Sequence, residues 1–168
     1  MLSKEMQDGL NNQINNEYFS SYTYLSMSAY CESLNMRGFA SWLRHQSKEE
    51  LEHALKLFDY VIDRDGKIVL KSIEQPQAKF ISLLKMFQQV LEHEREVTSM
   101  INKLYDRAIN EVDHATAVEL QWFIKEQVEE EKSARDIVDN LKLAGDNSSA
   151  LLILDREMAD SSSPASKA

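Results

Sequence analysis

Residues 39–60 of the chain read FASWLRHQSKEELEHALKLFDY, and this stretch decides how the rest of the sequence is interpreted. Its apolar residues recur in steps of three and four, which is the period of one face of an α-helix. That face is apolar at both ends but polar in the middle, where Gln46, Glu50 and His53 lie on it. Glu50 and His53 are three positions apart, so their side chains project from one helix face, one turn apart. The stretch predicts a core-facing helix with two ionisable groups at its centre.

Three other segments show the same pattern of an apolar seam that turns polar near its middle. The acids at these central positions are Glu17, Glu94 and Glu130. In a bundle of long helices, central positions lie in one layer whichever way each helix runs. The sequence therefore predicts that four carboxylates and the imidazole of His53 meet inside the core.

This predicted acid layer needs a compensating charge, because a carboxylate buried without a partner is costly. Four carboxylates carry a charge of −4, and two divalent ions would supply +4. We therefore predict a dinuclear metal site whose ligands are Glu17, Glu50, His53, Glu94 and Glu130. Oxygen-rich ligation with a single imidazole suits a hard ion and favours Fe³⁺ over Fe²⁺. A zinc site would usually carry more His or Cys.

The composition is typical of a single helical domain. The chain has 168 residues with only four Gly and two Pro, and helix-forming residues dominate it. The net charge is −9 and no basic face is visible, so nucleic-acid binding is not expected. Cys31 is the only cysteine, so no disulfide framework is expected within the chain. Residues 1–5 lack an apolar signal region and no apolar run approaches the length of a membrane span, which predicts a cytoplasmic protein without membrane contact.

Glycine and proline positions divide the chain into four long helices and a short fifth one. Pro76 is predicted to be the first residue of the third helix, Gly145 to stop the fourth, and Asn147 to cap the fifth. The predicted helices cover residues 3–33, 37–64, 76–109, 113–144 and 148–158. Residues 1–160 are predicted to form one domain, and residues 161–168 a Ser-rich disordered tail.

The connection between the second and third helices is longer than the other connections. Short connections make the first and second helices antiparallel, and likewise the third and fourth. Residues 65–75, with the apolar centre Ile68-Val69-Leu70, are predicted to be an extended segment that lies against the bundle. Extended, they span roughly 35–40 Å, whereas a helix of this length measures about 42 Å. The third helix can therefore run parallel to the second, which gives an all-α four-helix bundle with one long crossover.

The most specific stretches of the sequence are Asn16-Glu17-Tyr18, the run from Lys48 to His53, and Leu120-Gln121-Trp122-Phe123 through Gln127 to Lys132. On these stretches the chain closely resembles the bacterial non-haem ferritins, and the resemblance extends from Met1 to about Met158. Ferritin-like di-iron proteins carry one Glu on each of two helices and Glu-x-x-His on each of the other two. Here one motif is Glu50-x-x-His53, and the other is altered to Gln127-x-x-Glu130.

That alteration distinguishes ferritins from their relatives. Bacterioferritins keep His at the position of Glu130, and they bind haem through a Met where this chain has Leu51, so no haem is expected. Rubrerythrins carry a Cys-rich module that this chain lacks. A Dps-like mini-ferritin is disfavoured because its iron site lies between subunits, whereas this chain carries the complete ligand set of a single bundle.

The resemblance implies a ferritin-like fold and a ferroxidase activity. Such a protein oxidises Fe²⁺ with O₂ or H₂O₂ and stores ferric oxyhydroxide inside a homo-oligomeric, twenty-four-subunit cage. The short fifth helix, which carries Leu151 to Leu154, would line the four-fold axis of that cage.

The resemblance also implies a role for each site residue. Iron site A would be formed by Glu17, Glu50 and His53, and site B by Glu50 as the bridge with Glu94 and Glu130. Gln127 would orient a bound water or an O₂-derived ligand, while Tyr24 would hydrogen-bond the site and donate an electron. A third iron site would use Glu49, Glu126 and Glu129 and share Glu130.

Alternative interpretations remain open from the sequence. One is a di-iron oxidase or oxygenase that acts on an organic substrate, and the other is a non-enzymatic helical interaction protein whose acids bind no metal. The residues assigned to the third site could instead form a solvated helix face. His45, His93 and His114 have no partners at ligand spacing and are predicted to be surface residues.

Overall fold

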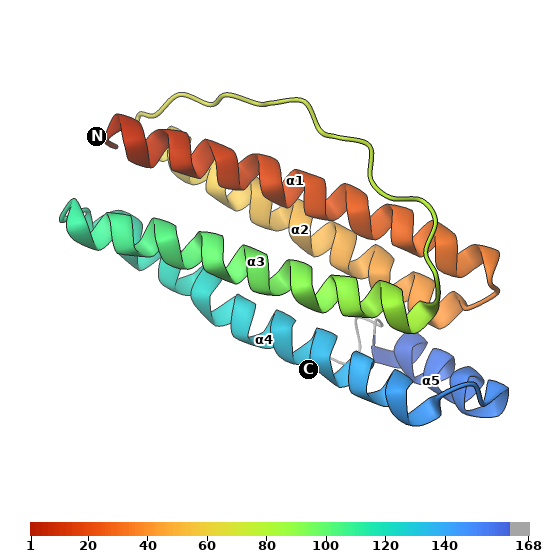
Figure 1. The fold of residues 1–168 in the computed structure, drawn as a ribbon. Coiled ribbons are helices and arrows are strands. Elements are labelled where there is room, and N and C mark those ends of the chain that lie inside the picture. The colour runs from red at the N-terminus through yellow and green to blue at the C-terminus, as the bar shows by residue number, and fades with distance from the viewer. Residues whose placement is uncertain (162–168) are drawn as a thin grey trace.

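The computed structural model describes residues 1–161 and shows four long helices with a fifth across one end of the bundle (Figure 1). Helices α1 and α2 are antiparallel, as are α3 and α4, and the crossover makes α3 parallel to α2. Residues 1–161 contain no strand, so the prediction of an all-α bundle with one long crossover and a short fifth helix is confirmed. The helices are α1 Lys4–Ser33, α2 Arg37–Asp63, α3 Leu83–Asn110, α4 His114–Ala144 and α5 Ser148–Ser161.

Two helix boundaries differ from the prediction by more than one residue. Helix α3 begins at Leu83 rather than at Pro76, and the side chain of Ser82 caps it by accepting a hydrogen bond from the backbone N–H of Lys85. The later start leaves residues 64–82 for the crossover, which can then run the length of the bundle without being fully stretched. Helix α5 continues to Ser161, beyond the predicted end at residue 158. Apart from Ser161, the predicted disordered tail lies outside the described residues.

Side-chain amides of α1 form hydrogen bonds with the backbone of the crossover. Asn11 donates to the carbonyl of Lys67 at 2.9 Å and accepts from the backbone N–H of Val69 at 2.8 Å. Gln7 accepts from the backbone N–H of Lys67 at 2.8 Å. These bonds satisfy backbone groups of an extended segment that has no neighbouring strand, while Ile68 packs against the core.

Helix α5 is held by the N-terminus of α2. The N-cap residue of α2, Met36, makes no side-chain capping bond, and Asp155 of α5 accepts instead from the backbone N–H groups of Gly38 at 2.8 Å and Phe39 at 3.0 Å. A Cβ atom at Gly38 would lie 1.5 Å from the carbonyl oxygen of Asp155, so only glycine allows this approach. The contact draws α5 across the end of the bundle.

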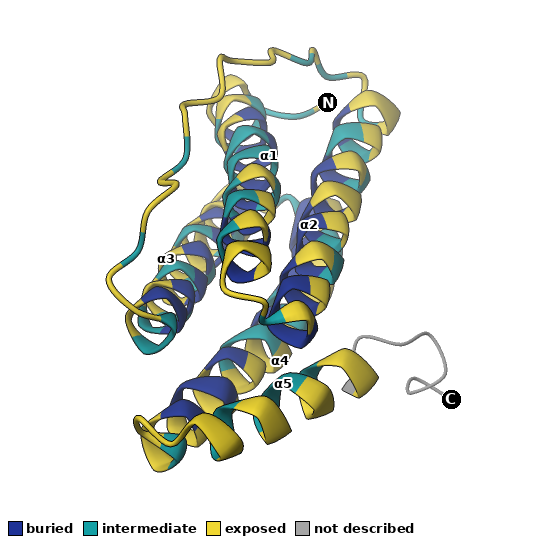
Figure 2. Ribbon diagram, turned by 90° about the vertical axis from the view of Figure 1, so that its right-hand side faces the viewer, coloured by how far each residue is buried: buried dark blue, intermediate teal, exposed yellow. Residues whose placement is uncertain are grey.

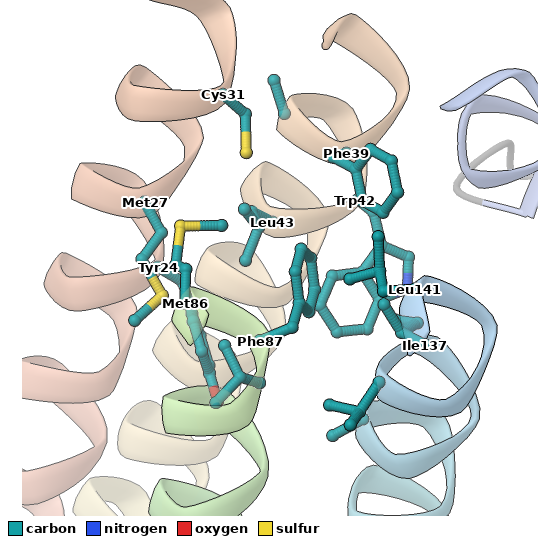
Figure 3. Packing of buried hydrophobic residues seen from close by; sticks show 14 residues of the cluster. Tyr24, Met27, Cys31, Phe39, Trp42, Leu43, Met86, Phe87, Ile137 and Leu141 are labelled. Carbon is teal, nitrogen blue, oxygen red and sulfur yellow. The ribbon is translucent and has the colours of Figure 1, made fainter. Parts of the chain in front are cut away.

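The buried faces of the helices point into the bundle (Figure 2), and the apolar core consists of two clusters. One cluster lies at the α5 end, where residues such as Met27, Leu43, Phe87 and Leu141 converge (Figure 3). The other lies at the opposite end and includes Leu10, Leu57, Ile101 and Leu120. Burying one such side chain contributes roughly 1.5–3 kcal/mol. The two clusters together can therefore support a polar layer between them.

Candidate metal centre

Three of the predicted ligands come together between the two apolar clusters. Glu17 of α1 is 1% exposed, and Glu50 and His53 of α2 are 2% and 6% exposed. Each of the three offers one ligand atom, and these atoms all lie within 4.8 Å of one another. His53 Nδ1 lies 3.5 Å from Glu50 Oε2. The Glu-x-x-His spacing on α2 therefore places both groups beside the acid of α1.

The two remaining acids reach the same interior from α3 and α4. Glu94 is 1% exposed, and Glu130 is half-buried. The negative charges of both acids act on Glu50, whose pKa is raised well above its usual range by burial first and by Glu94 next, with Glu130 adding to the effect. This coupling links Glu94 and Glu130 to the group formed by Glu17, Glu50 and His53.

Tyr24 and Gln127 both bind Glu94. The phenol of Tyr24 donates to Glu94 Oε1, and Gln127 Nε2 donates to Glu94 Oε2 at 3.1 Å and to the Glu94 carbonyl at 3.2 Å. Burial raises the pKa of the Tyr24 phenol well above its usual range, and the charge of Glu94 raises it further. Both residues therefore orient Glu94.

No Lys or Arg among residues 1–160 is buried beside the acids to compensate them. Burial raises the pKa of Glu17 well above its usual range, and the charge of Glu50 is the next cause. Glu17 Oε2 is buried, and no described residue donates a hydrogen bond to it. The acid layer therefore has a negative charge that either protons or metal ions can neutralise.

Aromatic rings fix the imidazole of His53. The ring of Trp122 lies 5.3 Å from it at an interplanar angle of 83°, and the ring of Phe123 lies 6.0 Å from it at 78°. Both are edge contacts that limit rotation of the imidazole. The rings come from α4, so α4 helps to position a ligand of α2.

The acids predicted for a third site lie at the margin of this layer. Glu49 is half-buried next to Glu50, adds to the upward shift of the Glu50 pKa, and has Oε1 3.4 Å from Nε2 of His45. Glu126 is half-buried and Glu129 is exposed. In the described part of the chain, the clustered group of metal-ligand atoms is the one formed by Glu17, Glu50 and His53. The third site therefore stays a prediction.

The prediction that the three other histidines are surface residues is wrong for His93. His93 is half-buried at the contact of α1 and α3, with Nε2 2.6 Å from Ser20 Oγ and its ring centroid 6.0 Å from that of Tyr24 in an edge contact. The seam pattern missed this contact because His93 lies beside the central stripe rather than on it. His114 is exposed as predicted, while His45 is partly exposed and faces Glu49.

Two further polar residues of the site were missed by the sequence interpretation. Gln13 Nε2 donates to Glu17 Oε1 at 2.7 Å, and Gln46 Nε2 donates to Glu130 Oε2 at 2.9 Å. Gln46 is visible on the seam of α2, where a buried amide needs a partner. Gln13 lies off the seam of α1, and only its spacing of four residues from Glu17 could have indicated the contact.

Comparisons with known proteins agree with this architecture. Residues 7–144 match the family model described as "Ferritin: Ferritin-like domain". The bacterial non-heme ferritin of Staphylococcus epidermidis is 40% identical over 159 residues, which are 95% of this chain and 96% of that protein. Its counterpart from Escherichia coli O157:H7 is 39% identical over the same shares. The novel open pore ferritin of the hyperthermophilic archaeon Archaeoglobus fulgidus superimposes with a TM-score of 0.94 and 46% identity, over 95% of this chain and 98% of that one.

Within residues 1–161, no helix is both long and apolar enough to cross a membrane.

Proposed function

The chain belongs to the ferritin family and is an iron-storage ferritin, and we propose that it oxidises Fe²⁺ with O₂ or H₂O₂ at the buried acid layer. Ferroxidase activity is general to the family, while the choice of oxidant belongs to the proposal. The observation that carries the proposal is the close approach of Glu17, Glu50 and His53 in a core where no Lys or Arg of residues 1–160 is buried.

Five residues are proposed to hold a pair of iron ions. Glu17, Glu50 and His53 bind the first ion, and Glu50 extends across to the second. Glu94 and Glu130 complete the second site, supported by the effect of their charges on the pKa of Glu50. Four carboxylates neutralise two Fe²⁺ ions, so a loaded pair removes the repulsion between the acids.

Iron is the substrate of this site, and the residues act by holding two ions together. Each Fe²⁺ gives up one electron, so a pair reduces one O₂ with two protons to H₂O₂, or one H₂O₂ with two protons to two H₂O. The hard carboxylate oxygens favour the ferric product. Oxidation raises the iron charge from +4 to +6 against −4 from the acids. That excess favours hydrolysis of the ferric ions and their release toward a mineral.

Tyr24 and Gln127 are proposed to act from the side of Glu94. Gln127 orients a water or an O₂-derived ligand. Its side-chain amide already donates to the Glu94 carboxylate and can turn toward such a ligand. Tyr24 hydrogen-bonds the site and supplies an electron when the iron ions provide fewer electrons than the oxidant needs. A third iron is proposed at the margin of the layer, bound by Glu49, Glu126, Glu129 and the shared Glu130.

The assembly is proposed to be a twenty-four-subunit cage in the cytoplasm, built from residues 1–160 as one ferritin-like domain. Support comes from the ferritin structures that superimpose on 95% of the chain. A cage gives the ferric product an enclosed volume in which to accumulate.

Two measurements on the assembled protein test this function. Stopped-flow absorbance after mixing with Fe²⁺ and O₂ should show a rapid diferric signal, and its absence would support a non-enzymatic interaction protein. Iron analysis after repeated Fe²⁺ additions should give far more than two ions per chain. A protein that stays at two ions per chain would instead fit an oxygenase with another substrate.

A further inference from the structure

Three buried glutamines surround the acid layer, and each donates its amide to a different carboxylate. Their exposed fractions are 2%, 5% and 4% for Gln13, Gln46 and Gln127. They come from three helices, α1, α2 and α4. The pairs are Gln13 Nε2 with Glu17 Oε1 at 2.7 Å, Gln46 Nε2 with Glu130 Oε2 at 2.9 Å, and Gln127 Nε2 with Glu94 Oε2 at 3.1 Å.

The amide is a particular choice of donor. A Lys or Arg would hold a carboxylate through a stronger, charge-assisted bond, but its positive charge would cancel a charge that iron needs. A glutamine amide offers two N–H donors and no net charge. The acids are therefore held in place while their full negative charge stays available to a cation.

The arrangement leaves specific carboxylate oxygens free. Gln13 holds Oε1 of Glu17, while Oε2 of the same group is buried and receives no hydrogen bond from any described residue. Glu50, the proposed bridge, receives no glutamine in the described part of the chain and has Glu17 and His53 as its neighbours. For Glu17, the oxygen that the first iron would need is therefore the one that Gln13 leaves unbound.

Gln13 and Gln46 hold their acids in different ways. Gln13 lies one turn before Glu17 on the same helix, so its bond fixes the side-chain rotamer of Glu17 locally. Gln46 lies one turn before Glu50 on α2 but reaches across to Glu130 on α4. Gln46 therefore ties together α2 and α4, two of the three helices that carry ligands of the proposed second iron.

We propose that Gln13 and Gln46 are positioning residues for iron binding, Gln13 for the first ion through Glu17 and Gln46 for the second through Glu130. The inference rests on the proposed function, since it assigns a role to residues that touch the proposed ligands. Partners that orient metal ligands typically set affinity by 10–100-fold. Removing either amide weakens one iron site by about that factor and leaves the other site near its original affinity.

The test is anaerobic calorimetric titration of Fe²⁺ into the assembled, metal-free protein. Gln13→Met and Gln46→Met each remove the donor while keeping an unbranched side chain of similar length, and Gln13→Leu and Gln46→Leu serve as second variants. Asn11→Met is the matched control, because Asn11 is also a buried amide of α1, 4% exposed, but binds the crossover backbone. Light scattering confirms that every variant is assembled as the wild type is.

We expect the wild type to bind two Fe²⁺ per chain in the acid layer. Gln13→Met should lower the affinity for one ion about 10–100-fold, and Gln46→Met the affinity for the other. Asn11→Met should lower the melting temperature and leave both iron affinities unchanged. Wild-type affinities in both glutamine variants, or an equal loss in all three variants, would overturn the proposal. Wild-type protein that binds Fe²⁺ but does not oxidise it in air would refute the ferroxidase, while the affinities still decide the role of the glutamines.

Discussion

Two polar clusters of the same bundle differ in how the negative charge of their carboxylates is compensated. Where α2 ends and α4 begins, Asp113 lies 3.1 Å from Arg64 Nη2 and accepts from the hydroxyl of Thr116 at 2.7 Å. Tyr60 completes this end cluster, its hydroxyl 2.9 Å from that of Thr116. In the middle of the bundle, Glu17 and Glu50 face other acids, and the described part of the chain places no buried Lys or Arg beside them. The end cluster contains a cation that stabilises its carboxylate, whereas the glutamine amides that donate to the acid layer are neutral, so the layer needs a cation from outside.

The pKa shifts in the two clusters have opposite signs. Burial alone would raise the pKa of Asp113, but hydrogen bonds from Thr116 and Arg64 outweigh it and hold the pKa below its usual range. Asp113 therefore contributes stability that is present above its unfolded-state pKa and lost as pH falls through the folded value. The raised pKa values of Glu17 and Glu50 mean that the fold holds protons that the unfolded chain has released. Those two acids destabilise the metal-free fold at neutral pH, and acid relieves this cost.

The largest expected effect follows from breaking the acid layer at its bridge. Glu50→Ala should abolish rapid Fe²⁺ oxidation, because Glu50 is proposed to contact both irons, while Glu17→Ala or Glu94→Ala should weaken mainly one site. Stopped-flow absorbance measures the rate. Arg64→Ala is the control from the end cluster and should oxidise iron at the wild-type rate once assembled. A Glu50→Ala protein as fast as wild type would remove the basis of the site assignment.

The second effect is on stability and comes from breaking the end cluster. Arg64→Ala leaves Asp113 without its cation and removes the bond from Arg64 Nη1 to Thr116 Oγ1. Removing one partner of a fully buried pair costs about 3–5 kcal/mol, and this pair is partly solvated, so we expect roughly 1–3 kcal/mol. Denaturant unfolding of metal-free protein measures the loss. An unchanged free energy of unfolding would mean that the end cluster adds nothing to stability.

The contrast between the clusters was only partly predictable from the sequence. Seam periodicity placed Glu17, Glu50 and Glu94 inward because it reports which helix face is buried. It could not assign partners, because a hydrogen bond across helices depends on side-chain rotamers and helix spacing. The bond from Gln46 to Glu130 and the network around Arg64 were missed for that reason.

The start of α3 was missed for a different physical reason. Pro76 fits the first turn of a helix, and Ser82 fits a cap equally well, so local preference alone could not choose between them. The choice is made by the distance that the crossover must cover. That distance is a property of the assembled bundle rather than of residues 76–82.

The third effect has the opposite sign to the second, although it also removes charged groups. Replacing Glu17, Glu50, Glu94 and Glu130 together with Gln should raise the melting temperature of the metal-free bundle by several degrees while destroying activity. The lower melting temperature of the wild type should approach that of the variant as pH falls below the raised pKa values of Glu17 and Glu50. Binding of Fe²⁺ should also remove the difference by mass action. Calorimetry at matched assembly state measures both trends. A quadruple variant that melts well below wild type would show that hydrogen bonds to these acids outweigh their repulsion.

The smallest expected effect concerns acids that are intermediate between the two clusters. Glu49 is half-buried and faces the imidazole of His45, and Glu126 is half-buried beside the layer, so neither is as isolated as Glu50. If these acids hold a third iron, that ion supplies an extra electron, and more than two Fe²⁺ are consumed per O₂. Glu49→Gln or Glu126→Gln should leave the first two irons bound and move the ratio toward two, the value set by reduction of O₂ to H₂O₂. Parallel oxygen-electrode and absorbance measurements give the ratio. Glu119→Gln is the control, because Glu119 is an acid that pairs with Lys56 at 3.0 Å and is not among the proposed iron ligands. A ratio unchanged in both variants would assign Glu49 and Glu126 to a solvated helix face, and the acid layer would then end at Glu130.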